Sequence, residues 1–214
     1  MDERATGIIL RTRPYTDTSV IVHWLTPDLG RLATLAKGAR RPKSPLRGKL
    51  DLFFHADFSF QRSRRSDLHA LREVVVKETH PSLRRDLSVL QQAAYGSALL
   101  EQITETETPL PELFPLFQDY LASLESGEAA PVVVFAYELK LLVEQGFQPS
   151  LKDSRLSLGA QRILEQLQSA GWPAVRRFHL TRAQQGEISI FLRHCLEQSF
   201  ERIPATRDDA VCVE

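Results

Sequence analysis

The chain has 214 residues, 43% hydrophobic and 25% charged, which is typical of a globular protein and excludes wholesale disorder. Its 27 Lys and Arg balance 27 Asp and Glu, and two cysteines are too few for a disulfide framework or a paired-cysteine zinc site. No apolar run approaches the ~20 residues of a spanning helix, and the N-terminal MDERATG has no apolar signal core. We therefore expect a cytoplasmic protein that binds no membrane, cofactor or metal ion.

The first eighty residues alternate apolar and other side chains with a period of two, as strands do when one face of a sheet is buried. The pattern predicts five strands, near residues 6–13, 19–26, 31–37, 52–62 and 68–77. Pro27 and Gly30 suit the turn between the second and third strands. Five short strands fit a small closed barrel, and the OB-fold is the five-stranded barrel whose face and loops bind nucleic acid.

From residue 82 the apolar period becomes that of an α-helix. About five helices are predicted, near residues 83–103, 110–124, 135–143, 157–170 and 181–195. Gly146 is placed to end the third helix, and Thr181 with Gln184 forms a capping-box pattern before the last. We expect a loop over Gln148–Leu158 and a surface tail over the last ten residues. The predicted fold class is α+β, with an OB-fold barrel over residues 1–80 and an α-helical bundle over residues 81–214.

Charge is divided unevenly between these halves. Residues 1–80 hold fifteen Lys and Arg against nine Asp and Glu, whereas residues 81–214 hold twelve against eighteen. The densest cluster is KGARRPKSPLRGK, residues 37–49, which falls between the third and fourth predicted strands, at the rim of the barrel. Like charges in one loop repel each other unless an anion neutralises them, which favours a phosphate backbone over a merely solvated loop. The basic residues concerned are Lys37, Arg40, Arg41, Lys43, Arg47 and Lys49.

A second basic cluster occupies the next inter-strand loop, and we predict that it too contacts DNA: Arg62, Arg64 and Arg65. Three further side chains are candidates to extend the track: Arg11, Arg13 and Arg31. The two prolines and two glycines of the first loop suggest that it can mould to a flexible strand. Tyr15 and Phe53 are candidates for base stacking, because the other aromatic residues near the fourth strand have the spacing of core positions.

The common catalytic and phosphate-cradling motifs GxGxxG, GxxxxGK[ST], GxSxG and HExxH are absent. His55 and Asp57 share a strand face but fit surface polar residues better than a reacting pair. His194 and Cys195 are adjacent on a predicted helix, so their side chains point in different directions. We therefore expect no enzymatic activity.

The segment GIILRTRPYTDTSVIVHWLTPDLGRLATLAKGARRPKSPLRGKL resembles the N-terminal domain of the RecO family of bacterial recombination mediators. The helical remainder is compatible in length and order but carries weaker motifs. The matching positions form an ordered series: Tyr15, Asp17, Ser19, Thr26, Pro27, Gly30, Arg31, Lys37, Gly38, Ala39, Arg40, Arg41, Ser44, Leu46, Arg47 and Gly48.

The resemblance implies an OB-fold domain that binds single- and double-stranded DNA at the basic loop, in a protein of the cytoplasmic nucleoid. It implies annealing of complementary strands and help in replacing single-strand-binding protein by the RecA recombinase, with RecR and the acidic tail of single-strand-binding protein as partners. Many family members carry a four-cysteine zinc module in the helical half. This chain has nothing comparable, and the Gln148–Leu158 loop is where the module would be missing.

Three other functions remain open. A protein–protein adaptor would use the basic loop to grip acidic tails, and charge reversal at Arg40, Arg41 and Arg47 would separate it from a DNA-binding protein. An RNA-directed OB protein fits the barrel but not the helical half. A nuclease fits worst, because no carboxylate cluster stands where metal ions would need one.

Overall fold

The computed structural model describes residues 2–109, 111–151 and 156–212. The chain divides into two compact units: a barrel unit, formed by Met1–His80 and Thr104–Pro115, and a helical unit, formed by Pro81–Ile103 and Leu116–Glu214. After its first long helix the chain therefore returns to the barrel unit for one short segment. Part of the predicted loop Gln148–Leu158, residues 152–155, lies outside the described residues, as do residues 213–214 of the predicted tail.

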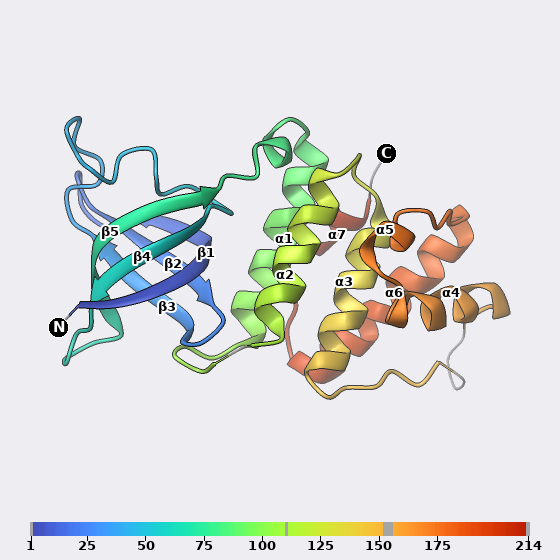
Figure 1. Cartoon of the computed structure of the whole chain (residues 1–214). Helices are drawn as coiled ribbons and strands as arrows, with labels where there is room; N and C mark the ends of the chain where they lie inside the picture. The colour runs from blue at the N-terminus through green and yellow to red at the C-terminus, as the bar shows by residue number, and fades with distance from the viewer. Residues whose placement is uncertain (1, 110, 152–155, 213–214) are drawn as a thin grey trace. The chain divides into compact units, whose positions relative to one another are not determined.

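Five strands make the barrel: β1 (Asp2–Pro14), β2 (Val20–Thr26), β3 (Gly30–Ala36), β4 (His55–Gln61) and β5 (Leu68–Glu78). They close in the order β1-β2-β3-β5-β4, and only β3 and β5 pair in parallel (Figure 1). The long strand β1 closes the barrel because its first half pairs with β4 and its second half with β2. An OB-fold barrel followed by helices is the predicted fold class, which is confirmed.

The barrel core is filled by side chains that alternate along the strands, as the period of two predicts. The ring of Trp24 stacks on that of Phe58, with centroids 4.1 Å apart. The indole Nε1 of Trp24 donates a 2.8 Å hydrogen bond to Oγ1 of Thr34, so the buried ring leaves no polar atom unsatisfied. Phe60 is fully buried beside them, and the predicted core role of Phe58 and Phe60 is correct.

Two predicted strand limits are wrong. Strand β1 begins at Asp2. Its first residues are mostly polar and lack the alternation that predicts a strand, but they pair with β4. Strand β4 begins at His55 and not at residue 52, because Phe53 adopts a φ of 65°, which interrupts an extended backbone. The amide of Phe53 donates a 2.8 Å hydrogen bond to the carbonyl of Ile9, and its side chain is 1% exposed. Phe53 is thus a core residue, and its predicted role as a free stacking platform is wrong.

The helices follow the barrel in chain order. They are the 3₁₀-helix η1 (Pro81–Arg84) and the α-helices α1 (Leu87–Ile103), α2 (Leu113–Glu125), α3 (Pro131–Glu144), α4 (Leu158–Ser169), α5 (Trp172–Val175), α6 (Arg182–Phe200) and α7 (Arg207–Val211). Helix α3 is buried on nearly every side, as expected for the central helix of a bundle. Within the described residues, no helix combines the length and apolar character that crossing a bilayer requires.

The helix ends confirm the predicted signals. Gly146 follows α3 with a φ of 82°, and the amide of Phe147 donates to the carbonyl of Leu142, the hydrogen-bond pattern of a glycine-terminated helix. Thr181 caps α6: its hydroxyl accepts from the amide of Gln184, whose side chain accepts from the amide of Thr181. These two signals mark the C-terminal end of α3 and the N-terminal end of α6.

The predicted surface tail is wrong where the structure describes it. Residues Arg207–Val211 form α7, in which Ala210 is fully buried and Val211 is 4% exposed. The carbonyl of Ala210 accepts a 2.9 Å hydrogen bond from the side-chain amide of Gln92 in α1. The helix is too short to show an apolar period, so its burial depends on contacts that sequence spacing does not reveal.

Candidate nucleic-acid interface

The basic loop, residues 37–54, connects β3 to β4 and consists of consecutive turns. Each turn is closed by a backbone hydrogen bond: Arg41 to Gly38, Ser44 to Arg41, Arg47 to Ser44 and Lys49 to Leu46. Two small apolar anchors hold the loop on the barrel, because Ala39 is 7% and Leu46 is 6% exposed within the barrel core. The loop therefore has a defined arrangement of its own, and its moulding to a flexible strand stays a prediction.

The six basic side chains of this loop lie mostly on its exposed surface. Five are exposed, and Lys49 is half-buried. Within the described residues, none of the six makes an ion pair, and the guanidinium of Arg47 donates only to the carbonyl of Pro42, at 3.2 Å. Cations held close together without carboxylate partners attract an anion. The full set is Lys37, Arg40, Arg41, Lys43, Arg47 and Lys49.

The turn between β1 and β2 lies against the basic loop. The amide of Arg40 donates a 3.0 Å hydrogen bond to the carbonyl of Thr18, and the amide of Gly38 donates to Oγ of Ser19 at 3.3 Å. Tyr15 belongs to the same turn and is 57% exposed. An exposed aromatic ring beside a cationic loop is the combination that single-stranded nucleic acid requires, so the candidate role of Tyr15 is kept.

The outer face of β1 and β2 adds positive charge next to this turn. Arg11 pairs with His23 and Arg13 with Ile21 across the two strands, and paired residues share a face. Burial, together with repulsion from Arg11, Arg13 and Arg31, lowers the pKa of His23 from 6.5 to about 4. Arg11, Arg13 and Arg31, which the sequence offers as candidates to extend the track, therefore lie close enough to His23 to disfavour its charged form.

The second basic cluster lies elsewhere. The β3–β4 loop begins at the C-terminal end of β3. The β4–β5 loop ends at the start of β5, where the parallel pairing of β5 with β3 begins. Because the two strands run in the same direction, the two loops lie at opposite ends of the barrel. Arg64 and Arg65 are exposed there. The guanidinium of Arg62 is held by two carboxylates: Nε lies 2.9 Å from Glu3, and Nη1 lies 2.6 Å from Glu107. The two predicted basic clusters therefore belong to separate surfaces of the barrel.

Both the side chain and the backbone of Arg31 make structural hydrogen bonds. Its guanidinium donates to the carbonyl of Thr104, and its own carbonyl accepts a 2.9 Å hydrogen bond from the amide of Glu107. Both partners belong to the segment that returns to the barrel unit after α1. Sequence reasoning missed this segment because it shows neither a strand nor a helix period.

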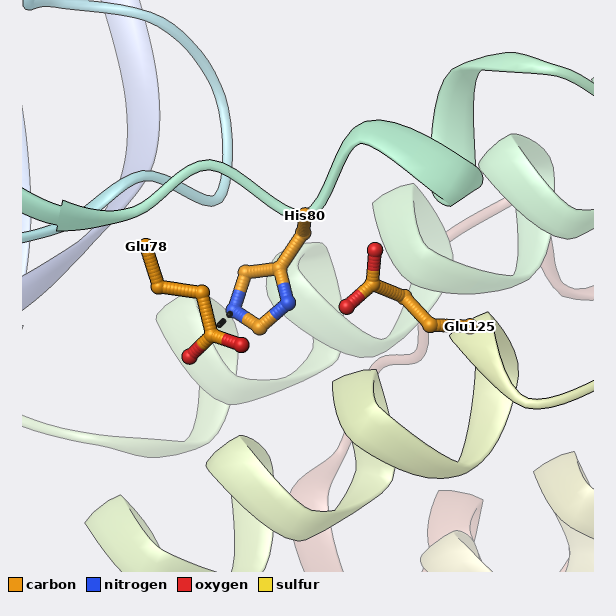
Figure 2. Close-up of side chains that lie close together, drawn as sticks. All are labelled: Glu78, His80 and Glu125. Atoms are coloured by element: carbon orange, nitrogen blue, oxygen red, sulfur yellow. Dashed lines mark ion pairs between the residues drawn. The ribbon is translucent and has the colours of Figure 1, made fainter.

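Other titratable groups singled out in the sequence are held by local contacts. Asp57 accepts from Thr6 and lies 2.7 Å from Lys77, and these hydrogen bonds lower the pKa of its carboxyl group. Burial raises the pKa of the Cys195 thiol, the opposite of what activates a nucleophile. At the end of the barrel unit, Nε2 of the buried His80 lies 3.7 Å from Oε2 of Glu78 (Figure 2).

Two family models match the chain. The model described as "Recombination protein O N terminal" covers residues 1–80, and the model described as "Recombination protein O C terminal" covers residues 84–157. The first match thus spans all five strands and the basic loop, and the second spans α1, α2 and α3.

Curated relatives agree with these models. The chain is 34% identical over 148 residues to a protein of Bacillus pumilus named "DNA repair protein RecO", covering 69% of this chain and 57% of that protein. It is 31% identical over 154 residues to the protein of that name from Myxococcus xanthus, covering 72% of this chain and 63% of the relative. The chain therefore spans about three fifths of the length of these relatives. With both domain models matched in order, the chain belongs to the RecO family.

Proposed function

We propose that this protein is a DNA-binding mediator of recombinational repair, and that the basic loop is its principal DNA site. The observation that carries the proposal is the set of six basic side chains that make no ion pair with any described residue, held on a loop whose turns are closed by backbone hydrogen bonds. Pre-ordering lowers the entropy lost on binding, and phosphates supply the charge that the loop lacks. The relatives, which are named as DNA repair proteins, support the same role.

The activity proposed is annealing of complementary single strands and help in replacing single-strand-binding protein by RecA at the nucleoid. A loop that neutralises phosphates lets two polyanions approach each other without any bond being made or broken in a substrate. Such binding is directed mainly at the backbone, so it requires little sequence preference. RecR, single-stranded DNA, double-stranded DNA and the tail of single-strand-binding protein are the proposed partners.

The test compares two triple variants that remove the same charge. The first replaces Arg40, Arg41 and Arg47 of the basic loop by Ala, and the control replaces three exposed arginines of the helical unit, Arg162, Arg177 and Arg182. Binding to a labelled single-stranded oligonucleotide is measured over a series of salt concentrations, together with annealing of complementary strands coated with single-strand-binding protein. The loop variant should lose about two units of slope in log K against log salt, at about 0.7 per phosphate, while the control keeps the wild-type slope.

Equal slopes in the two variants would overturn the assignment of the loop to DNA. The alternative function, an adaptor for acidic protein tails, predicts a different result. In that case the loop variant binds DNA like the wild type but loses a peptide with the acidic tail of single-strand-binding protein.

A further inference from the structure

The acidic strap, residues 104–109 with the sequence TETETP, is fitted onto the start of β3. Thr106 forms a parallel bridge with Arg31, and the amide of Glu107 donates to the carbonyl of Arg31 at 2.9 Å. Gly30 has a φ of 67°, and a Cβ atom there would lie 1.9 Å from the carbonyl oxygen of Thr108. Only glycine allows this close approach, so the strap and the strand are complementary in shape.

Glu107 is the residue of the strap that reaches the second basic cluster. One carboxylate oxygen lies 2.6 Å from Nη1 of Arg62, and the other lies 2.8 Å from Nε2 of His69. His69 is 2% exposed, and its Nδ1 accepts from the amide of Ser63 at 3.3 Å, so Nε2 carries the proton that is donated to Glu107. A carboxylate with two such donors occupies the position that a phosphate oxygen would take.

The other two arginines of the cluster are exposed to solvent. Arg62 also holds Glu3, at 2.9 and 3.1 Å, whereas the neighbouring Arg64 and Arg65 are exposed and make no ion pair within the described residues. The two carboxylates raise the pKa of Arg62, which remains a cation in any arrangement of the strap. The cluster therefore keeps a strong attraction for anions at the barrel end opposite the basic loop.

We propose that the acidic strap covers a second nucleic-acid site, formed by Arg62, Arg64 and Arg65, in which Glu107 stands where a backbone phosphate binds. The proposal rests on the proposed function for its ligand class but concerns a different surface. Ion pairs this exposed contribute little to stability, so a polyanion can displace Glu107. Glu107 also has a φ of 56°, a conformation that side chains other than glycine adopt at a cost, so release of the strap relieves backbone strain.

Glu107→Gln tests the proposal, with Glu105→Gln as the matched control. Glu105 lies on the same strap, is exposed and carries the same charge, but among the described residues no hydrogen bond or ion pair joins it to the cluster. Affinity for a single-stranded oligonucleotide should rise by about two- to fivefold in E107Q, and the salt slope should grow by about 0.7. Adding Arg62→Ala to E107Q should remove the gain, whereas E105Q should bind like the wild type. Equal gains in E107Q and E105Q would show a general charge effect and overturn the proposal.

Glu107→Asp keeps the charge but withdraws the carboxylate by one methylene group. It should also bind the oligonucleotide more tightly, and an affinity equal to the wild type would contradict the proposal. If E107Q does not unfold cooperatively, E107D replaces it in the test, because the hydrogen-bond donors of Arg62 and His69 then still face a carboxylate.

The substitution E107Q is also tested in a variant that lacks the basic residues of the loop, because this distinguishes the present proposal from the proposed function. With all six basic residues of the loop replaced by Ala, E107Q should restore part of the lost binding, and no restoration would overturn the masked site. If the six replacements leave binding unchanged while E107Q still strengthens it, the assignment of the loop fails and the masked site stands.

Discussion

Arg207 of α7 and Glu138 of α3 meet in the interior of the helical unit through two hydrogen bonds, of 2.7 and 2.8 Å. Their side chains are 1% and 0% exposed. Tyr95 adds a 2.5 Å hydrogen bond from its hydroxyl to Oε1 of Glu138, and Nη1 of Arg207 donates to Ser189 at 3.2 Å. The last described helix is therefore fastened to the central helix by a buried pair of charges.

Removing one partner of this pair should be strongly destabilising. Arg207→Ala leaves a buried carboxylate without its counter-charge, and we expect a loss of about 3–5 kcal/mol in the free energy of unfolding, measured by urea denaturation. The triple variant with Glu138→Leu, Arg207→Met and Tyr95→Phe replaces the network by apolar groups. It should recover most of this loss, and a triple variant as unstable as Arg207→Ala would refute the explanation by an unpaired charge.

His23 should make stability depend on pH. Its pKa is about 4 in the folded protein and 6.5 ordinarily, so the unfolded chain binds the proton first as pH falls. The contribution of His23 is therefore fully present above pH 6.5 and declines as pH falls toward about 4. Urea denaturation of the wild type and His23→Gln over this range should show a smaller decline in the variant. Parallel curves would contradict the folded pKa.

Gly30 and Gly48 offer a matched pair for the strap. Both have positive φ, 67° and 74°, but a Cβ at Gly30 would strike Thr108, whereas a Cβ at Gly48 meets nothing within 4 Å. Gly48→Ala should cost only the conformational penalty, about 1 kcal/mol. Gly30→Ala should cost roughly 1–3 kcal/mol more, because the strap must move. Thermal melting of both variants checks the difference, and equal melting temperatures would show that the contact with the strap is unimportant.

Tyr15 should matter for single strands more than for duplexes. Stacking of one base contributes about 1–3 kcal/mol, and the bases of a duplex are already stacked on each other. Tyr15→Ala should therefore weaken binding of a single-stranded oligonucleotide at least fivefold, by about 1 kcal/mol, and leave duplex affinity nearly unchanged. Tyr15→Phe keeps the ring and serves as the control. Similar losses for the two kinds of DNA would argue against stacking.

Sequence periodicity predicted the fold well where elements bury one face. Trp24 and Phe58 fall on the inner face of the barrel because a strand has a side-chain period of two. Gly146 and Thr181 mark helix ends because capping depends on residues close together in the chain. The basic loop was likewise placed correctly between β3 and β4, since its neighbours are regular strands.

The failures concern contacts between residues far apart in sequence. Phe53 looked exposed by alternation, but its positive φ takes it out of strand β4 and into the core. Arg62 looked like a free cation, but Glu3 and Glu107 reach it from 59 and 45 residues away. Arg207 looked like part of a surface tail, and its partner Glu138 is 69 residues distant. Such pairings depend on tertiary packing, and a local pattern contains no record of them.

The strap also affects any study of the barrel as an isolated fragment. A fragment that ends at His80 contains all five strands, yet it lacks Thr104 and Glu107, which hold Arg31, Arg62 and His69 in the whole chain. Such a fragment presents more open positive charge than the intact protein does. Under the proposed masking, the affinity of this fragment for DNA would exceed that of the whole chain, and a representative fragment must include the strap through a linker or as an added peptide.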